Sequence, residues 1–431
     1  MDNTLHTPKL PLISVIMANF NGAKYIARAL HSVLAQTHHA IELIVSDDGS
    51  TDQSVTIVQD IMANDDRVRL IRSPASTGPA AARNRALQMA TGAWVAVIDS
   101  DDLIHPERLA RLLMSAEALQ ADIVADDLIF FSEDLSEGPR TLFQNLDLAR
   151  PEMVNSLALI TGTLPGQRDV ALGYIKPLIR RAVIGDIRYN EDLRVDEDHD
   201  FYLRLLLDGA RCALIPDAMY LYRRHAASLS HRFSVAKLEP MIAAQDVLLR
   251  RLDTQQDLRA ALAQRIKGHK QQLHYAHLIE LLKARHFPAA LGQLIRHPAN
   301  WRLLIGTMKE RSLHQSQTRT KTRPRMTVIL CAPGALIVDD YPDFTVVQVP
   351  DVPSTGWAHS SAATWANLAR LACAYDLHVI AVGRAGVFAL GVVPQYLSAR
   401  IAHSDHDLQT MTARGPTSGQ PPRSAQYARS L

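Results

Sequence analysis

Residues 94–102 read Trp-Val-Ala-Val-Ile-Asp-Ser-Asp-Asp, an apolar run that ends in three closely spaced carboxylates. The run predicts a strand over residues 94–98 that is buried on both faces, as in a parallel sheet covered by helices. Pro106 follows, a residue favoured in the first turn of a helix, and it predicts a helix over residues 106–119. A strand, an acidic turn and a helix in this order favour an α/β fold with a ligand site at the carboxyl end of the strand.

The same alternation extends over residues 12–130. Apolar or β-branched runs predict five strands, at residues 14–18, 41–46, 68–72, 94–98 and 122–130. Apolar residues at helical spacing, or an opening proline, predict helices between them, at residues 26–34, 79–89 and 106–119. A later helix is expected over residues 198–208, ending at Gly209. We therefore expect a Rossmann-like, mostly parallel sheet sandwiched by helices.

Composition limits the function classes. The chain has 431 residues and 47% hydrophobic content, which favours two folded units. Lys and Arg number 46 against 44 Asp and Glu, so a broad basic surface for nucleic acid is excluded and no nucleic-acid partner is expected. The three cysteines are widely spaced and favour neither a disulfide framework nor a zinc site. We expect a cytoplasmic protein with neither a signal peptide nor a transmembrane helix.

Positive charge is concentrated in residues 251–326, which contain fifteen Lys or Arg and four Asp or Glu. Their helical pattern suits either a module on an anionic membrane surface or a helical hairpin with a solvated basic face. We expect a catalytic domain over residues 10–235 and this basic helical segment over residues 236–326. A small α/β unit should follow over residues 327–403, with strands at 327–331, 344–349 and 378–382 and a helix at 362–374. Residues 404–431 are expected to be disordered.

Three acidic clusters carry the candidate chemistry, at residues 47–52, 99–102 and 196–200. The first follows a strand and suits either a helix cap or a ligand site. In the second, carboxylates so close together repel one another unless a cation neutralises them. An Asp-x-Asp pair at a strand end can bind Mg²⁺ or Mn²⁺ and leave positions open for phosphate oxygens. The third begins a helix, where acids are favoured by the dipole, or supplies a general base.

These clusters, together with Ser-Val-Ile-Met-Ala-Asn-Phe-Asn at residues 14–21, resemble the family 2 glycosyltransferases, which have the GT-A fold. The chain is similar to members that act in bacterial exopolysaccharide biosynthesis of the succinoglycan type. The resemblance covers residues 12–232. Where the family has a Pro/Thr-x-Tyr-Asn pattern at the uridine, this chain has Ala18 and Phe20, which retain backbone contacts and ring stacking but lack the tyrosine hydroxyl.

The resemblance implies a role for individual residues. Asp198, in the Glu-Asp pair, is implied as the catalytic base. Asp99 and Asp101 are implied as the metal-binding pair for Mg²⁺ or Mn²⁺, with Asp101 the direct ligand. His225, within an Arg-x-His-x-x-Ser-x-Ser-like element, is implied as a diphosphate or metal contact. Binding of the nucleotide-sugar is implied for Ala18, Phe20, Asp48, Arg83, Asp99, Arg223 and Arg224.

We therefore expect an inverting, metal-dependent glycosyltransferase that moves a sugar from a nucleotide-sugar, a UDP-sugar, to a glycan or lipid-linked acceptor. Surface-polysaccharide or exopolysaccharide biosynthesis is the expected setting, with the protein peripheral on the inner face of the plasma membrane. Two alternatives remain: a catalytically inactive nucleotide-sugar-binding scaffold and a metal-dependent phosphohydrolase using the same carboxylates.

Overall fold

The structure is a computed structural model that describes residues 10–132, 140–164 (without 144, 145, 147 and 149), 172–224, 234–305 (without 253, 254 and 302), 325–331, 345–348, 376–382 and 400–402. The helix expected at residues 362–374, the tail at 404–431 and His225 lie outside these residues.

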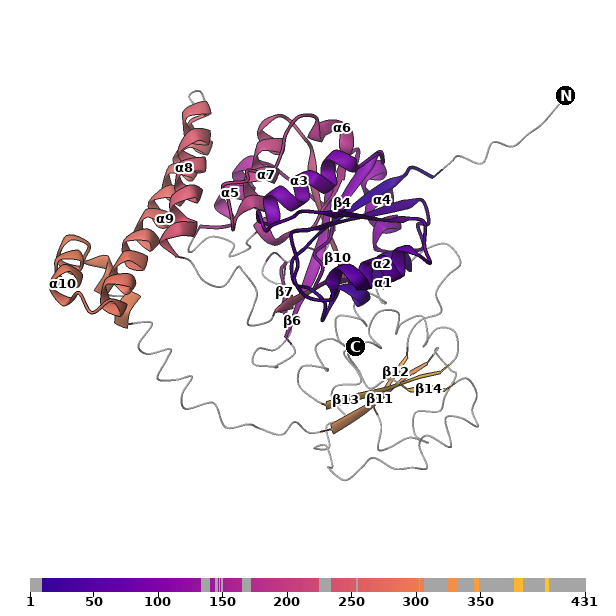
Figure 1. Ribbon diagram of the computed structural model, residues 1–431. Helices are drawn as coiled ribbons and strands as arrows, with labels where there is room; N and C mark the ends of the chain where they lie inside the picture. Colours follow the sequence, from indigo (N-terminus) through magenta and orange to yellow (C-terminus); the bar gives the residue numbers. More distant parts are fainter. Residues whose placement is uncertain are drawn as a thin grey trace.

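A ten-stranded sheet forms the centre of the larger unit (Figure 1). Its main strand order is β3-β2-β1-β4-β9-β6-β10-β5. The first four strands in that order are parallel, β9 runs antiparallel to both neighbours, and β10 is parallel to β6. The strands are β1 (Ile13–Asn19), β2 (Ile41–Asp47), β3 (Val68–Arg72), β4 (Trp94–Val97), β5 (Leu103–Ile104), β6 (Ile123–Ser132), β7 (Arg140–Thr141), β8 (Glu152–Val154), β9 (Leu178–Arg180) and β10 (Cys212–Arg224). All five predicted strands are confirmed, with ends that differ by at most two residues.

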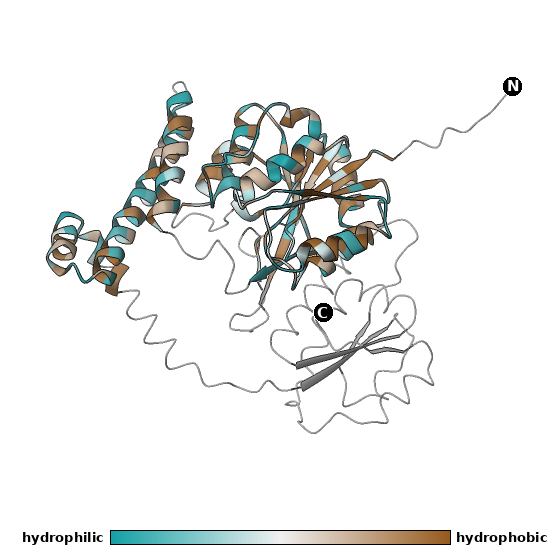
Figure 2. Cartoon of the chain, in the orientation of Figure 1, coloured by the Kyte–Doolittle hydropathy of each residue, from teal (hydrophilic) through white to brown (hydrophobic). Residues whose placement is uncertain are grey.

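Helices cover both faces of this sheet, with α1 and α2 on one side and α3 on the other (Figure 1). They are α1 (Ile26–Leu34), α2 (Ser54–Met62), α3 (Pro79–Met89), α4 (Arg108–Leu119), α5 (Ser156–Thr161), α6 (Arg181–Ile184) and α7 (Glu197–Leu207). Strands β1, β2 and β4 are apolar and almost wholly buried, which is why the strands in Figure 2 are largely brown. The predicted α/β sandwich is thus confirmed. The third predicted helix begins at Arg108, because Pro106 and Glu107 form a turn before it.

The apolar core of the sheet continues into the next helices. Leu248 in α8 (Val235–Arg251) and Leu262 and Ile266 in α9 (Gln256–Lys283) belong to the same buried cluster as the strands. Helix α10 (Phe287–Arg296) packs on α9 in a separate small cluster. The core therefore extends past residue 235, and the first half of α9 is part of it. Within the described residues, the helices are all too short or too polar to cross a bilayer.

A second sheet comprises four parallel strands in the order β12-β11-β13-β14. They are β11 (Arg325–Cys331), β12 (Thr345–Gln348), β13 (Asp376–Val382) and β14 (Arg400–Ala402). The three strands expected in this region are present, and β14 is a fourth that the sequence pattern did not indicate.

Candidate active site

Two loops at the carboxyl edge of the parallel strands are hydrogen-bonded together. Nδ2 of Asn19, at the end of β1, donates to Asp47 at the end of β2 over 2.9 Å. The backbone N–H of Asn21 donates to Oγ of Ser50 over 2.8 Å. Phe20 lies between these contacts and is 53% exposed, so its ring is available to a ligand. Ala18 and Phe20 are therefore both at the edge where a parallel sheet presents its ligand sites.

Asp48 holds the loop that leads into α3. Its carboxylate accepts hydrogen bonds of 2.7–2.9 Å from both the N–H and the hydroxyl of Thr77, the N–H of Gly78, the hydroxyl of Ser76 and Nη2 of Arg85. Burial opposes its ionisation, but these donors outweigh burial and lower the pKa of Asp48 to about 2. In this structure the carboxylate of Asp48 therefore accepts its hydrogen bonds from residues of the protein itself. Its contact with the nucleotide-sugar remains a prediction.

The turn at residues 99–102 is held by strand β10. Asp102 is buried and accepts 2.7 Å hydrogen bonds from the hydroxyl of Tyr220 and the backbone N–H of Arg223. Nε of Arg223 donates to the carbonyl of Asp101 over 2.7 Å. Burial, and then repulsion from Asp101 and Asp99, raise the pKa of Asp102 well above its usual value.

Burial is the larger cause of that shift, but the contributions of Asp101 and Asp99 reflect the negative charge at this turn, and a divalent cation stabilises such an environment. Mg²⁺ or Mn²⁺ prefers oxygen ligands and commonly binds one or two carboxylates, so Asp99 and Asp101 have suitable chemistry, although both oxygens of Asp99 pair with Arg83 and Lys176 in this structure. Within the described part of the chain, no group of three or more His, Cys, Asp or Glu side chains forms a metal cluster.

Two buried cations join this turn to the start of α7. Nη2 of Arg83 lies 2.8 Å from Asp99, and its Nη1 lies 2.6 Å from Glu197. Nζ of Lys176 lies 2.8 Å from the other oxygen of Asp99 and 2.7 Å from Oδ2 of Asp198. Three carboxylates from two distant segments are therefore cross-braced by Arg83 of α3 and Lys176, which precedes β9.

Three members of the network, Arg83, Lys176 and Asp99, have pKa values shifted toward their charged forms, whereas burial raises the pKa of Glu197. Burial disfavours charge on Arg83 and Lys176, but Asp198 and Asp99 outweigh it and raise the pKa of both side chains well above their usual values. For Asp99, burial is likewise outweighed, by Lys176 and Arg83, and its pKa is lowered. Oδ1 of Asp198 is buried, has an ion-pair contact of 3.5 Å with Arg83 and accepts no hydrogen bond from the residues that the structure describes. The role of this oxygen in proton transfer remains a prediction.

The structure therefore brings three predicted residues together: Arg83, Asp99 and Asp198. Arg223 contacts the same acidic turn, while the guanidinium of Arg224 lies 4.7 Å from the centre of the Phe130 ring. The metal role of Asp101 and the roles of the residues named here remain predictions.

Sequence reasoning missed Lys176. The signal was present, because Lys176 interrupts the otherwise uncharged run Tyr-Ile-Lys-Pro-Leu-Ile at residues 174–179. A lysine in an apolar run is seldom buried without a partner, so its position predicts a buried carboxylate nearby. Tyr220 was missed as well, since a tyrosine in a strand has no distinguishing pattern.

Comparison with known proteins gives the following similarities. Residues 14–170 match the family model described as "Glycosyl transferase family 2". The succinoglycan biosynthesis protein ExoO of Rhizobium meliloti (strain 1021) is 33% identical over 292 residues, which are 67% of this chain and 83% of ExoO. ExoU of the same organism is 31% identical over 300 residues, which are 68% of this chain and 86% of ExoU. Among solved structures, S. aureus TarS 1-349 is 24% identical with a TM-score of 0.49, covering 66% of this chain and 80% of TarS 1-349.

Proposed function

Because this chain belongs to glycosyl transferase family 2 and is a glycosyltransferase, we propose that it transfers a sugar, with inversion, from a UDP-sugar to a hydroxyl of a glycan or lipid-linked oligosaccharide. We propose surface or exopolysaccharide biosynthesis as its setting, since ExoO and ExoU are named as succinoglycan biosynthesis proteins. The activity is proposed to depend on Mg²⁺ or Mn²⁺ at Asp99 and Asp101.

The observation that carries this proposal is the brace from Asp99 to Asp198 through Lys176. It holds Asp198, the proposed proton acceptor, beside the turn at residues 99–102, where the diphosphate of the nucleotide-sugar is proposed to bind. In the proposed step, the acceptor oxygen bonds to the anomeric carbon while the bond from that carbon to the diphosphate oxygen breaks. The acceptor proton passes to Oδ1 of Asp198, and the nucleoside diphosphate leaves with the bonding electrons.

The second requirement of the reaction is stabilisation of the negative charge that develops on the departing diphosphate. A divalent cation, when bound, supplies electrostatic stabilisation of the departing diphosphate. Arg223 and Arg224 lie at the end of β10, and Arg223 orients the acidic turn through the carbonyl of Asp101. Phe20 is proposed to stack on the nucleobase of the nucleotide-sugar, since its exposed ring lies at the carboxyl edge of β1.

An anionic membrane surface is proposed as a further partner, through helix α10. Phe287, Leu291 and Ile295 are four residues apart, so they share one face of the helix, and they are 54–71% exposed. The neighbouring face of the helix is already covered, because Ala290 and Leu294 are buried in a cluster with Leu278 of α9. Exposed basic side chains lie just before α10 and at its end, and their charge is opposite to that of anionic lipid: Lys283, Arg285 and Arg296.

The test is an assay of the 431-residue chain with a panel of UDP- and GDP-sugars, with and without Mn²⁺ or Mg²⁺, and with and without a lipid-linked acceptor. Nucleotide release that requires the acceptor, together with a glycosylated product, supports the proposal. Binding of nucleotide-sugars without turnover across the acceptors would instead support a scaffold. Equal release without an acceptor would support a phosphohydrolase.

A further inference from the structure

The residue that opens α7 has an unusual backbone conformation. Asp196 has φ 68°, in the left-handed region that few residues other than glycine adopt and in which Asn and Asp are the commonest exceptions. Glu197 and Asp198 follow it directly, in the first turn of the helix. The direction in which Asp198 leaves the loop therefore depends on how the chain at Asp196 is held.

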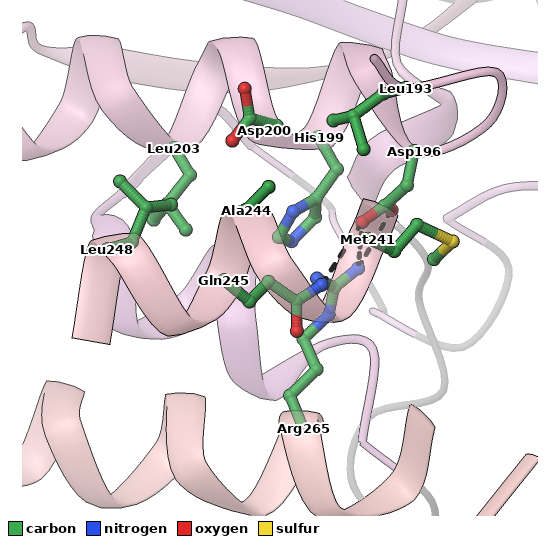
Figure 3. Close-up of a pocket in the computed structure, with 10 residues that line it drawn as sticks. All are labelled: Leu193, Asp196, His199, Asp200, Leu203, Met241, Ala244, Gln245, Leu248 and Arg265. Carbon is green, nitrogen blue, oxygen red and sulfur yellow. Dashed lines mark hydrogen bonds and ion pairs between the residues drawn. The ribbon is translucent and has the colours of Figure 1, made fainter. Parts of the chain in front are cut away.

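Asp196 is held from a helix that lies 69 residues further along the chain. Nη2 of Arg265, in α9, donates to both carboxylate oxygens of Asp196 over 2.8 and 2.9 Å. Arg265 also donates through Nε to the hydroxyl of Thr163 over 3.0 Å, just after α5. Figure 3 shows the guanidinium of Arg265 directed at Asp196, with Gln245 of α8 beside it.

The pair is enclosed, so it is not a weak surface contact. The side chains of Arg265 and Asp196 are 6% and 17% exposed. Burial opposes ionisation of Asp196, but Arg265 outweighs it and lowers the pKa of this carboxyl. The loop before Asp196 is also packed on α8, since Leu193 and Val195 share a buried cluster with Leu238 and Met241. Helix α8 therefore holds the loop by apolar packing, and α9 holds it by the ion pair between Arg265 and Asp196.

We propose that Arg265 is a positioning residue for the proton-accepting carboxylate Asp198, and that α8 and α9 are thereby a working part of the catalytic unit. The proposal rests on the proposed function where it takes Asp198 as the base. Lys176 and Arg83 hold the carboxylate itself, whereas Arg265 fixes the backbone turn from which α7 starts.

The test compares Arg265→Gln with a control from the same two helices. Lys270 of α9 pairs with Asp246 of α8 at 3.8 Å on the surface, so Lys270→Gln removes a charge from α9 without touching Asp196. In Arg265→Gln, kcat should fall about 10- to 100-fold, because small misplacement of a reacting group has large kinetic effects. The dissociation constant for UDP should stay within about twofold, since the hydrogen bonds of Arg265 go to Thr163 and Asp196 and to none of the residues assigned to the nucleotide. Arg265→Lys should recover part of kcat, and Lys270→Gln should match the wild type.

Hydrogen exchange tests the positioning role of Arg265 independently of the proposed sugar transfer. Amide hydrogen exchange of residues 194–200 should be faster in Arg265→Gln than in the wild type or Lys270→Gln, whether or not transfer is observed. If the wild type transfers no sugar, the proposed function is wrong, but the exchange experiment still tests whether Arg265 holds the loop at Asp196. Unchanged exchange in these residues, or an unchanged kcat, would overturn the positioning role.

Misfolding is controlled with a double variant. Asp196→Asn combined with Arg265→Met leaves no unpaired buried charge, so the fold should be retained. A low kcat in this folded double variant supports positioning by the ion pair. Recovery of wild-type kcat would show that the pair only neutralises buried charge, and the proposal would then be wrong.

Discussion

The Nζ atom of Lys176 lies 2.7 Å from Oδ2 of Asp198, although 22 residues separate the two in the chain. Both side chains are nearly buried, so this ion pair fixes the orientation of the carboxylate in a site with little room for rearrangement. The other oxygen, Oδ1 of Asp198, lies 3.5 Å from Arg83 and accepts no hydrogen bond within the described part of the chain.

The first prediction concerns Lys176→Met. It leaves Asp99 and Asp198 buried with Arg83 as their remaining cation, and breaking a buried pair on one side commonly costs about 3–5 kcal/mol of unfolding free energy. We expect a loss of this size in urea unfolding and loss of sugar transfer. The exposed Lys267 of α9 provides the control, since Lys267→Met should change neither quantity. Wild-type stability of Lys176→Met would contradict the claim that Lys176 stabilises the carboxylates of Asp99 and Asp198.

The second prediction separates metal binding from proton transfer. Asp101→Asn and Asp198→Asn should each abolish transfer in a chain that still folds, with Asp198→Asn less stable because it breaks the buried pair with Lys176, and EDTA should abolish transfer by the wild type. Asp198→Asn should still bind UDP in the presence of Mn²⁺ within about twofold of the wild type, because its carboxylate acts on the acceptor. Asp101→Asn should lose the Mn²⁺ dependence of UDP binding, measured by calorimetry. Asp60→Asn, on the exposed side of α2, is the control. Full activity of either variant would refute the role assigned to that residue.

The third prediction concerns helix α10. Leu291→Glu combined with Ile295→Glu should greatly reduce co-sedimentation with phosphatidylglycerol vesicles, because it places charge on the apolar face. The wild type should bind these vesicles more tightly than phosphatidylcholine vesicles, and added salt should weaken the difference. Met114 in α4 is 58% exposed on another surface, so Met114→Glu is a matched control that should bind normally. Equal binding by the double variant and the control would argue against α10 as the contact.

The fourth prediction is a pH dependence of stability. Burial lowers the pKa of His105 to about 3 from an ordinary value of 6.5. Between these values the unfolded chain binds a proton that the folded chain does not, so stability is lost as the pH falls from 6.5 towards 3. For this group alone the slope is about 1.4 kcal/mol per pH unit. His105→Gln should therefore show a shallower decline in unfolding free energy by about that amount, measured by urea titration at several pH values. Parallel curves for the two proteins would contradict the shift.

Local patterns were sufficient to predict the parallel half of the sheet. Strands β1, β2 and β4 are largely apolar, and acidic turns follow β2 and β4, so both the strands and the sheet edge that carries the candidate site follow from local sequence patterns. The grouping of Asp99 with Asp198 depended on the family resemblance. No spacing in the chain relates these two residues, and only the fold brings both of them to Lys176.

The partners of these carboxylates were harder to predict, because they arise from tertiary packing. Arg265 belongs to a segment whose excess of basic residues suggested either a membrane module or a solvated face. Its side chain is instead buried beside Asp196, while most of the other basic residues of α9 are exposed. Composition averages over such differences, so one buried arginine among many exposed cations leaves no trace in the charge pattern.

Strand β10 has a consequence for the order in which the protein is made. Tyr220 and Arg223 hold the acidic turn at residues 99–102 from positions 118 to 122 residues later. During synthesis, the turn therefore leaves the ribosome long before the strand that fixes it, and pairing over such a separation is slow to form. Since Arg265 emerges later still, a nascent chain that ends before α9 would have its acidic residues in place on the sheet but would lack the anchor for Asp196. Competence for sugar transfer should thus be acquired late in translation, after most of the sheet has already folded.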